Sequence, residues 1–276
     1  MQGERFSEDL HQLAGEAWEV AGRLCGTCRN LHVLWPYQRL AGSPGRDVAV
    51  VEPVLRRLLS ASGRKVLIAG CADSGLLALV ARTANPATAI TVVDRCETPL
   101  ELCRRFARRW DFTVDTDHLD LTELSATSSF DVVFAHELLQ HIPADRRVDT
   151  LSRMRHAMRA EGRLVLVFHT SNRVDGDVVT AYQQHFPQHL IERLEANGVA
   201  LPEPREAFRR RAESYADEWR AREGALASRA EVESLLGVAG FDIEDLTPIE
   251  VDRPKQFREL AAKVNKQRFL AVARSR

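Results

Sequence analysis

Strand-like runs alternate with helix-like segments from residue 65 to residue 170, and this alternation constrains the fold more than any other feature of the sequence. The runs are KVLIAG, AITVVD, FDVVFA and GRLVLVFHT, with the more polar FTVDTDHLDL as a further strand and its exit loop. Segments with helical periodicity, such as SGLLALVARTA, separate them. Continuous apolar strands between helices are typical of a parallel sheet that is covered on both faces. We therefore predict an α/β fold with an open, doubly wound sheet and right-handed crossovers.

The sequence on either side of this alternation indicates more helices and two more strands. The N-terminal part has apolar residues at helical spacing, with Pro36 at a helix start or kink and a third helix from Asp47 to Ser60. The helix DRRVDTLSRMRHAMRA is expected to end at Gly162, and SRAEVESLLGVAGFDIEDLTPI supplies a helix, a glycine stop and a strand before the final strand RFLAVA. We expect an N-terminal helical cap over 1–62, a ligand-binding core over 63–170, a helical insert over 171–226, and the rest of the core sheet over 227–276.

Composition excludes several classes of function. The formal net charge is −1 at pH 7, so no overall positive field would draw the chain to nucleic acid. No apolar run reaches the ~20 residues that span a bilayer, and the N-terminus lacks the apolar stretch of a signal peptide. We therefore expect a cytoplasmic protein that binds neither membranes nor nucleic acid.

The chain has five cysteines, of which Cys25 and Cys28 form a CxxC pair. An odd number of cysteines in a large chain argues against a disulfide scaffold. A structural zinc ion needs four ligands, and the sequence contains no second CxxC. We therefore interpret the pair as two helix-facing thiols and expect no metal.

The first predicted strand ends at the turn GCADSG, which is the best candidate for a ligand-binding loop. In an open parallel sheet, ligands bind beyond the carboxyl ends of the strands, where the strand order reverses. Gly70 and Gly75 allow close approach of the backbone, and the helix that follows offers unpaired N–H groups and a partial positive charge. The second strand ends in Asp94, which is placed to accept hydrogen bonds from the hydroxyls of a ribose.

Two ligands fit a glycine turn followed by a strand-terminal acid. A dinucleotide oxidoreductase requires G-x-G-x-x-G, but this chain has Ala72 and Asp73 where backbone must approach a pyrophosphate. The carboxylate of Asp73 would also repel the phosphates. An adenosyl ligand that carries an amino acid and no phosphate tolerates that carboxylate, which is placed to face the ammonium group of the ligand.

These motifs resemble those of class I S-adenosylmethionine-dependent methyltransferases. VLIAGCADSGLLAL is similar to the first motif of that family, ITVVD to the second, HLDL to the adenine-contacting loop, FDVVFAHELLQHIP to the fourth and GRLVLVFHT to the fifth. The sequence departs from the family at Ile68, where an acidic residue is usual, and at Ala72 and Asp73. The resemblance implies a mostly parallel seven-stranded sheet, the cofactor S-adenosylmethionine, and a cofactor site formed by Ala69, Gly70, Cys71, Asp73, Gly75, Asp94, Arg95, Asp120, Leu121 and His136.

Two histidines are candidates for a general base. Methyl transfer requires mainly alignment of the acceptor, and a base is needed only where the acceptor must lose a proton. His136 follows the fourth strand and His169 ends the fifth, so both are expected at the rim of the pocket, either as bases or as lining residues. We expect Glu137 to be solvated or to cap a turn, and His141 to pack in one.

The insert over 171–226 lies where methyltransferases of this family carry a substrate lid. Its aromatic residues are expected either to cover a small acceptor or to pack on the sheet. Arg209 belongs to a cationic run that is either a solvated helix face or a site for an anionic group. The candidate substrate residues are Trp35, Tyr37, Tyr182, His185 and Arg209.

We predict a small-molecule methyltransferase with an oxygen or nitrogen acceptor, of the kind that serves secondary metabolism. One alternative is an RNA methyltransferase, although the mixed charge of the insert provides no basic groove. The other alternative is a protein that binds S-adenosylmethionine on the same fold without transferring its methyl group. The expected partner is a small-molecule substrate, and the sequence is compatible with a homodimer.

Overall fold

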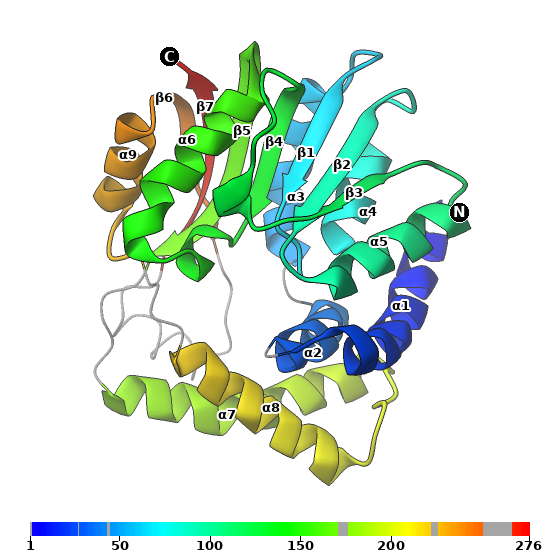
Figure 1. Ribbon diagram of the computed structural model, residues 1–276. Coiled ribbons are helices and arrows are strands. Elements are labelled where there is room, and N and C mark those ends of the chain that lie inside the picture. Colours follow the sequence, from blue (N-terminus) through cyan, green and yellow to red (C-terminus); the bar gives the residue numbers. More distant parts are fainter. Residues whose placement is uncertain (1, 27, 43–44, 171–175, 222–225, 251–266) are drawn as a thin grey trace.

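The computed structural model describes residues 2–26, 28–42, 45–170, 176–221, 226–250 and 267–276, without the side chains of 2–10, 45–46, 176–183 and 219–221. Its centre is a seven-stranded sheet with the order β3-β2-β1-β4-β5-β7-β6 (Figure 1). The strands are β1 (Lys65–Ala69), β2 (Ala89–Asp94), β3 (Asp115–His118), β4 (Phe130–His136), β5 (Met158–Thr170), β6 (Phe241–Pro248) and β7 (Gln267–Ser275).

Helices cover both faces of the sheet and form a further layer beside it. The described α-helices are α1 (Gln2–Leu24), α2 (Arg29–Leu40), α3 (Gly45–Leu58), α4 (Gly75–Thr83), α5 (Glu97–Arg109), α6 (Arg147–Ala157), α7 (Gly176–Ala196), α8 (Arg205–Ala221) and α9 (Arg229–Val238). Short 3-10 turns are η1 (Leu121–Glu123), η2 (Leu139–His141) and η3 (Ala144–Arg146). None of these described helices has the length and apolar character that a membrane crossing requires.

The first five strands are parallel, as the alternation of strands and helices predicts, and β7 runs antiparallel between β5 and β6. The strand order reverses between β1 and β4, which are neighbours although β2 and β3 separate them in sequence. Ile68 of β1 pairs with Phe134 of β4, so Gly70 and His136 lie at the same edge of the sheet, each two residues further along. This is the edge where an open parallel sheet binds its ligand.

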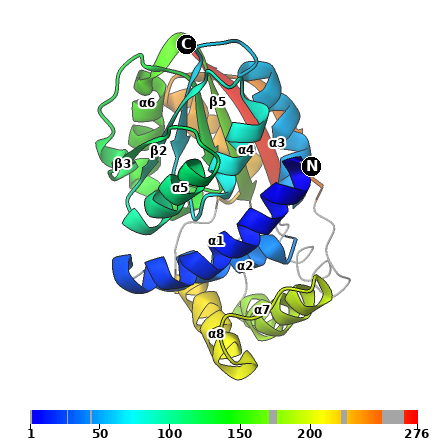
Figure 2. The same cartoon turned by 90° about the vertical axis from the view of Figure 1, so that its right-hand side faces the viewer.

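Three clusters of buried apolar residues hold the layers of helices and sheet together. One cluster packs α6 and α9 on one face of the sheet, and a second packs α3, α4 and α5 on the other. The third lies outside the sheet and joins α1 and α2 to α7 and α8, through residues such as Leu34, Tyr37, Ile191 and Phe208. Figures 1 and 2 show this helical layer below the sheet, on the side where β1 and β2 end.

The predicted end of the helix before β5 is wrong. Helix α6 ends at Ala157, and β5 already begins at Met158, which pairs with Phe130 next to a register shift in β4. Gly162 therefore lies in the strand, and its role is steric: a β-carbon there would lie 3.0 Å from the carbonyl oxygen of Arg159 and 3.1 Å from that of Phe130. A glycine in a strand commonly marks such a close approach of two backbones.

Candidate functional site

The loops after β1, β2 and β3 are joined by hydrogen bonds at the carboxyl edge of the sheet. The Gly70 amide donates to the Val93 carbonyl at 2.8 Å, and the Leu119 amide donates to the Asp94 carbonyl at 3.1 Å. The Asp94 carboxylate accepts the Cys71 amide at 2.8 Å and the Cys96 amide at 2.7 Å. Asp94 is thus held in one orientation by the turns on both sides of it.

The Asp94 carboxylate retains capacity to bind a ligand. An ionised carboxylate offers roughly four acceptor positions, and the two backbone amides use one on each oxygen. The side chain is half-buried. Burial raises the pKa of Asp94, although the amides of Cys71 and Cys96 oppose this shift. The chemistry of this carboxylate fits the hydroxyls of a ribose.

Gly70 needs to be a glycine for two reasons. Its φ of +75° is in the left-handed region, which disfavours other residues. A β-carbon there would also lie 2.8 Å from Cδ1 of Leu138 and 3.9 Å from Cδ1 of Leu121. The side chains that follow β4 and β3 therefore meet over the turn that follows β1. Asp120 starts η1 by accepting the Thr122 amide at 2.9 Å, which fixes the loop that carries Leu121.

Asp73 and Arg39 form a buried ion pair at the start of α4. Arg39 Nε and one of its terminal nitrogens donate to the two oxygens of Asp73 at 3.0 and 2.9 Å, and Asp73 also accepts the Gly75 amide. A β-carbon on Gly75 would overlap the guanidinium of Arg39. Gly75 therefore makes room for a cationic group of α2, and the two opposite charges lie next to the candidate ligand loop.

The close approach at Gly75 gives a direct prediction. Gly75→Ala should displace Arg39, break its bidentate pair with Asp73 and destabilise the fold by about 1–3 kcal/mol, the usual cost of overpacking. Thermal or urea unfolding measures this loss. Gly15→Ala in α1 is the matched control, because a β-carbon at that position would have nothing within 4 Å and alanine favours helix. Equal stability changes in the two variants would contradict the packing role of Gly75.

A second group of buried charges lies at the ends of β4, β5 and β7. His136 Nε2 donates to Asp47 of α3 at 2.9 Å, and Arg268 of β7 donates to both Asp47 oxygens at 3.1 and 2.8 Å. Arg268 Nε also lies 3.1 Å from Oε1 of Glu137. Residues far apart in the sequence are thus linked into one network at the edge where β4 ends.

Glu137 is the centre of this network, and the expectation that it is solvated is wrong. Its side chain is only 10% exposed, it ion-pairs with His169 Nδ1 and with Arg268, and it accepts a 2.6 Å hydrogen bond from Gln140. Burial by itself would raise the pKa of Glu137, but the charges of His169 and Arg268 outweigh it and hold that pKa well below its usual range.

The backbone of Glu137 is strained as well. Its φ of 54° is in the left-handed region, which a glutamate seldom adopts. Residues held in such conformations at the end of a strand cost about 1–3 kcal/mol and concentrate at functional sites. Strain, burial and a shifted pKa coincide at this position, so the Glu137–His169 pair is the best candidate for reactive side chains in the described part of the chain.

Sequence reasoning identified His136 and His169 but missed Glu137, Asp47, Arg268 and Arg39. Glu137 had a signal, because it immediately follows the strand that ends in His136. The sequence contains no signal that connects Asp47 with Arg268, because they are 221 residues apart. Only the pairing of β7 with β5 brings Arg268 opposite His169.

The predicted substrate residues whose side chains the structure describes lie in different surroundings. Tyr37 is buried against Trp18 and Phe208, and burial raises its pKa to about 12. His185 is exposed, and Trp35 is half-buried. Arg209 is exposed and pairs with Glu213 and Glu206, as on a solvated helix face. The side chain of Tyr182 lies outside the described residues, and Arg95, a predicted cofactor residue, is exposed.

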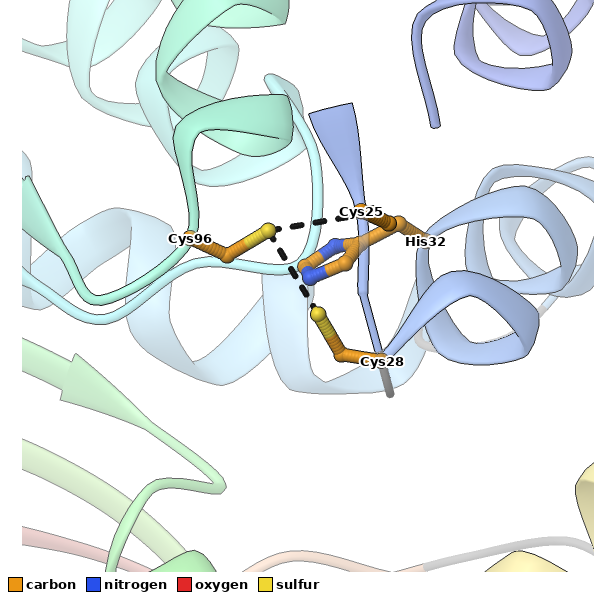
Figure 3. Close-up of side chains that lie close together, drawn as sticks. All are labelled: Cys25, Cys28, His32 and Cys96. Carbon is orange, nitrogen blue, oxygen red and sulfur yellow. Dashed lines mark hydrogen bonds between the residues drawn. The ribbon is translucent and has the colours of Figure 1, made fainter. Parts of the chain in front are cut away.

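The interpretation of Cys25 and Cys28 as two separate helix-facing thiols is also wrong. Their sulfur atoms lie beside His32 and Cys96, and one donor atom from each of these four residues falls within 4.8 Å of the others (Figure 3). His32 follows Cys28 by four positions and was visible in the sequence as C-x3-H. Cys96 was not, because it lies 68 residues beyond Cys28.

Comparison with known proteins identifies a methyltransferase domain in the chain. Residues 66–162 match a family model described as a methyltransferase domain, whereas curated protein sequences gave no match. The fold is similar to that of a geranyl diphosphate methyltransferase in complex with SAM, with a TM-score of 0.57, 13% identity and 94% of each chain covered. It is also similar to geranyl diphosphate C-methyltransferase from Streptomyces coelicolor A3(2), with a TM-score of 0.55, 12% identity, and 83% of this chain and 77% of that chain covered.

A third similar structure is the [4+2]-cyclase SpnF, with a TM-score of 0.53, 15% identity, and 82% of this chain and 79% of that chain covered. The matched domain contains the Gly70 turn, Asp94 and Glu137, which lie at the ends of the neighbouring strands β1, β2 and β4. Residues 66–162 are therefore a methyltransferase domain of the class that uses S-adenosylmethionine, and the cofactor of this domain is S-adenosylmethionine.

Proposed function

We propose that this enzyme methylates an oxygen or nitrogen atom of a small molecule, with His169 as general base. The observation that carries the proposal is the buried, strained Glu137 that holds Nδ1 of His169 at the carboxyl edge of the sheet. The same edge carries the Gly70 turn, because β1 and β4 are neighbours. An acceptor above this edge would meet the methyl group on one side and the histidine on the other.

The cofactor would be held by residues of the first three loops. The Asp94 carboxylate has acceptor positions for the ribose hydroxyls, and Leu121 and Asp120 belong to the loop expected to contact the adenine. The Gly70 turn permits close approach of the backbone. Arg39 and Asp73 present a cation and an anion beside this turn, which suits the carboxylate and ammonium groups of the methionine part.

The roles of the side chains follow from their pairing. When bound, S-adenosylmethionine supplies a methyl group that is already activated for in-line displacement. In its neutral form, His169 would donate its Nδ1 proton to the Glu137 carboxylate, and Nε2 would carry the basic lone pair that accepts a proton from a hydroxyl or amine. The Glu137 carboxylate fixes this tautomer and stabilises the imidazolium that results. His136 is committed to Asp47 and positions the end of β4.

The helical layer is the candidate substrate cover. Helices α7 and α8 follow β5 in the chain and pack through Phe186, Ile191 and Phe208 on α1 and α2. This arrangement supports a division into N-terminal cap, core, helical insert and C-terminal strands at the boundaries expected from the sequence. A cover of this kind would exclude water from the acceptor.

A second candidate function is a reaction on the same fold without methyl transfer. The [4+2]-cyclase among the similar structures supports this alternative. The expected result for our proposal is that calorimetric titration detects binding of S-adenosylmethionine and S-adenosylhomocysteine, and that radiolabelled methyl groups move to acceptors in a panel of phenols, amines and hydroxylated metabolites. Binding of both compounds with no transfer to any acceptor would favour the non-methylating alternative, and absence of binding would refute both.

A further inference from the structure

Four side chains with metal-binding donor atoms meet where the N-terminal helices touch the sheet. Cys25 follows α1, Cys28 precedes α2, and His32 is in the first turns of α2, while Cys96 lies in the turn between β2 and α5 (Figure 3). The thiols and the imidazole therefore come from three separate segments of the chain. The site lies outside the network of Glu137 and His169.

The distances match a tetrahedral metal site. Cys96 Sγ lies 3.7 Å from Cys25 Sγ and 3.5 Å from Cys28 Sγ. Zinc binds thiolate sulfur at about 2.3 Å, so two sulfurs of a tetrahedral site lie about 3.8 Å apart. A disulfide would require a separation of about 2.05 Å, and all three cysteines are free in the structure.

The surroundings of the cluster complete such a site. Nδ1 of His32 donates to the Ala72 carbonyl at 2.8 Å, so the lone pair of the ring lies on Nε2. Metal-bound histidines usually donate their other ring N–H in this way, which fixes the tautomer. Thr98 Oγ1 lies 2.9 Å from Cys25 Sγ, where its hydroxyl can donate to a thiolate. His32 and Cys96 are buried, and Cys25 and Cys28 are half-buried.

We propose that Cys25, Cys28, His32 and Cys96 bind one Zn²⁺ as a structural Cys3His site. Three sulfurs and one nitrogen in a tetrahedral arrangement select zinc over harder divalent cations, and four protein ligands leave no open position for catalysis. Binding displaces the thiol protons of the three cysteines to solvent, and no change of oxidation state is involved.

The ion would fasten the N-terminal helices to the turn that carries the ribose-binding acid. The Cys96 amide donates to the Asp94 carboxylate at 2.7 Å, and His32 holds the Ala72 carbonyl of the first ligand loop. Zinc would therefore fix both turns at once. This coupling to the cofactor, unlike the metal site itself, rests on the proposed function.

The metal content of the purified protein tests the site directly. Protein purified under reducing conditions without chelators should contain about one zinc per chain by plasma mass spectrometry. Cobalt replacement should give the thiolate-to-cobalt charge-transfer and tetrahedral ligand-field absorption bands. Less than a tenth of an equivalent of metal together with no uptake of zinc or cobalt by the reduced protein would overturn the proposal, as would a disulfide between any two of Cys25, Cys28 and Cys96 in that protein.

Variants separate the metal site from general effects on folding. Cys28→Ser and Cys96→Ser should each lose at least tenfold in zinc affinity and unfold at lower temperature. Cys103→Ser, a buried cysteine of α5 outside the cluster, should keep its zinc; equal zinc binding in all three variants would overturn the assignment. If the cluster variants do not fold, the cobalt spectrum of the wild-type protein alone decides whether the four residues bind a metal ion. Zinc binding without S-adenosylmethionine binding would leave the metal site standing and refute only its coupling to the cofactor.

Discussion

Replacing Asp94 with alanine is expected to raise the dissociation constant for S-adenosylmethionine about 100-fold. Hydrogen bonds to a charged group contribute about 1.5–3 kcal/mol each, and the loss of even one corresponds to roughly this factor. The substitution also frees the amides of Cys71 and Cys96, which the carboxylate now holds in place. Calorimetric titration of the variant with S-adenosylmethionine and S-adenosylhomocysteine measures the change.

The control for this prediction is Asp117→Ala on the neighbouring strand β3. Asp117 is exposed and pairs in register with Val93, one residue before Asp94, so its removal changes the local charge without touching the loop hydrogen bonds. We expect its affinity to stay within about twofold of the wild type, because exposed substitutions usually change stability by less than about 0.5 kcal/mol. Unchanged affinity in a folded Asp94→Ala protein would exclude the ribose contact.

Glu137→Gln is expected to cost about 3 kcal/mol of unfolding free energy at neutral pH. The glutamine keeps the size of the side chain but removes the charge that faces His169 and Arg268, and breaking a buried ion pair on one side typically costs about 3–5 kcal/mol. Urea unfolding measures the loss. Where an acceptor has been found, kcat should also fall, because His169 loses the carboxylate that orients it.

The same variant makes a prediction about pH. The pKa of Glu137 in the folded protein lies well below the ordinary value of 4.5, so its ionised form stabilises the fold above that ordinary pKa. This stabilisation should be lost as the pH falls through the depressed pKa, and the wild-type protein and Glu137→Gln should then converge. Glu123→Gln, at an exposed position, should match the wild type throughout. A constant difference between wild type and Glu137→Gln down to the acid transition would mean that packing, not charge, explains the loss.

The fold was predictable from the sequence because its signals are local and repeated. Each buried strand of the parallel part is a short apolar run, and the runs alternate with helices, which leaves few arrangements open. The end of α6 was mispredicted because a glycine at position 162 is compatible with two structures. It can end a helix, or it can permit a close contact in a strand. Only the pairing of Met158 with Phe130 distinguishes them.

The candidate site was predictable only where a loop follows directly from a strand. Gly70 and Asp94 lie at strand ends, so their place at the ligand edge follows from the order of elements alone. The Glu137 network and the cysteine cluster depend on contacts between distant segments, such as Asp47 with Arg268 and Cys28 with Cys96. A single sequence contains no local signal for such contacts. The sequence also left His136 either as a general base or as a residue that lines the pocket. In the structure, His136 Nε2 is hydrogen-bonded to Asp47.

The position of β7 has a consequence for biosynthesis. This strand follows the other six in sequence, yet it lies inside the sheet between β5 and β6 and brings Arg268 to Asp47 and Glu137. During translation, the nascent N-terminal part can form the early βα units while the two carboxylates still lack their cation. Assembly of the reactive centre therefore waits until residues 267–275 have emerged from the ribosome. A premature stop codon anywhere before Arg268 would leave a product in which Asp47 and Glu137 lack the guanidinium that they share.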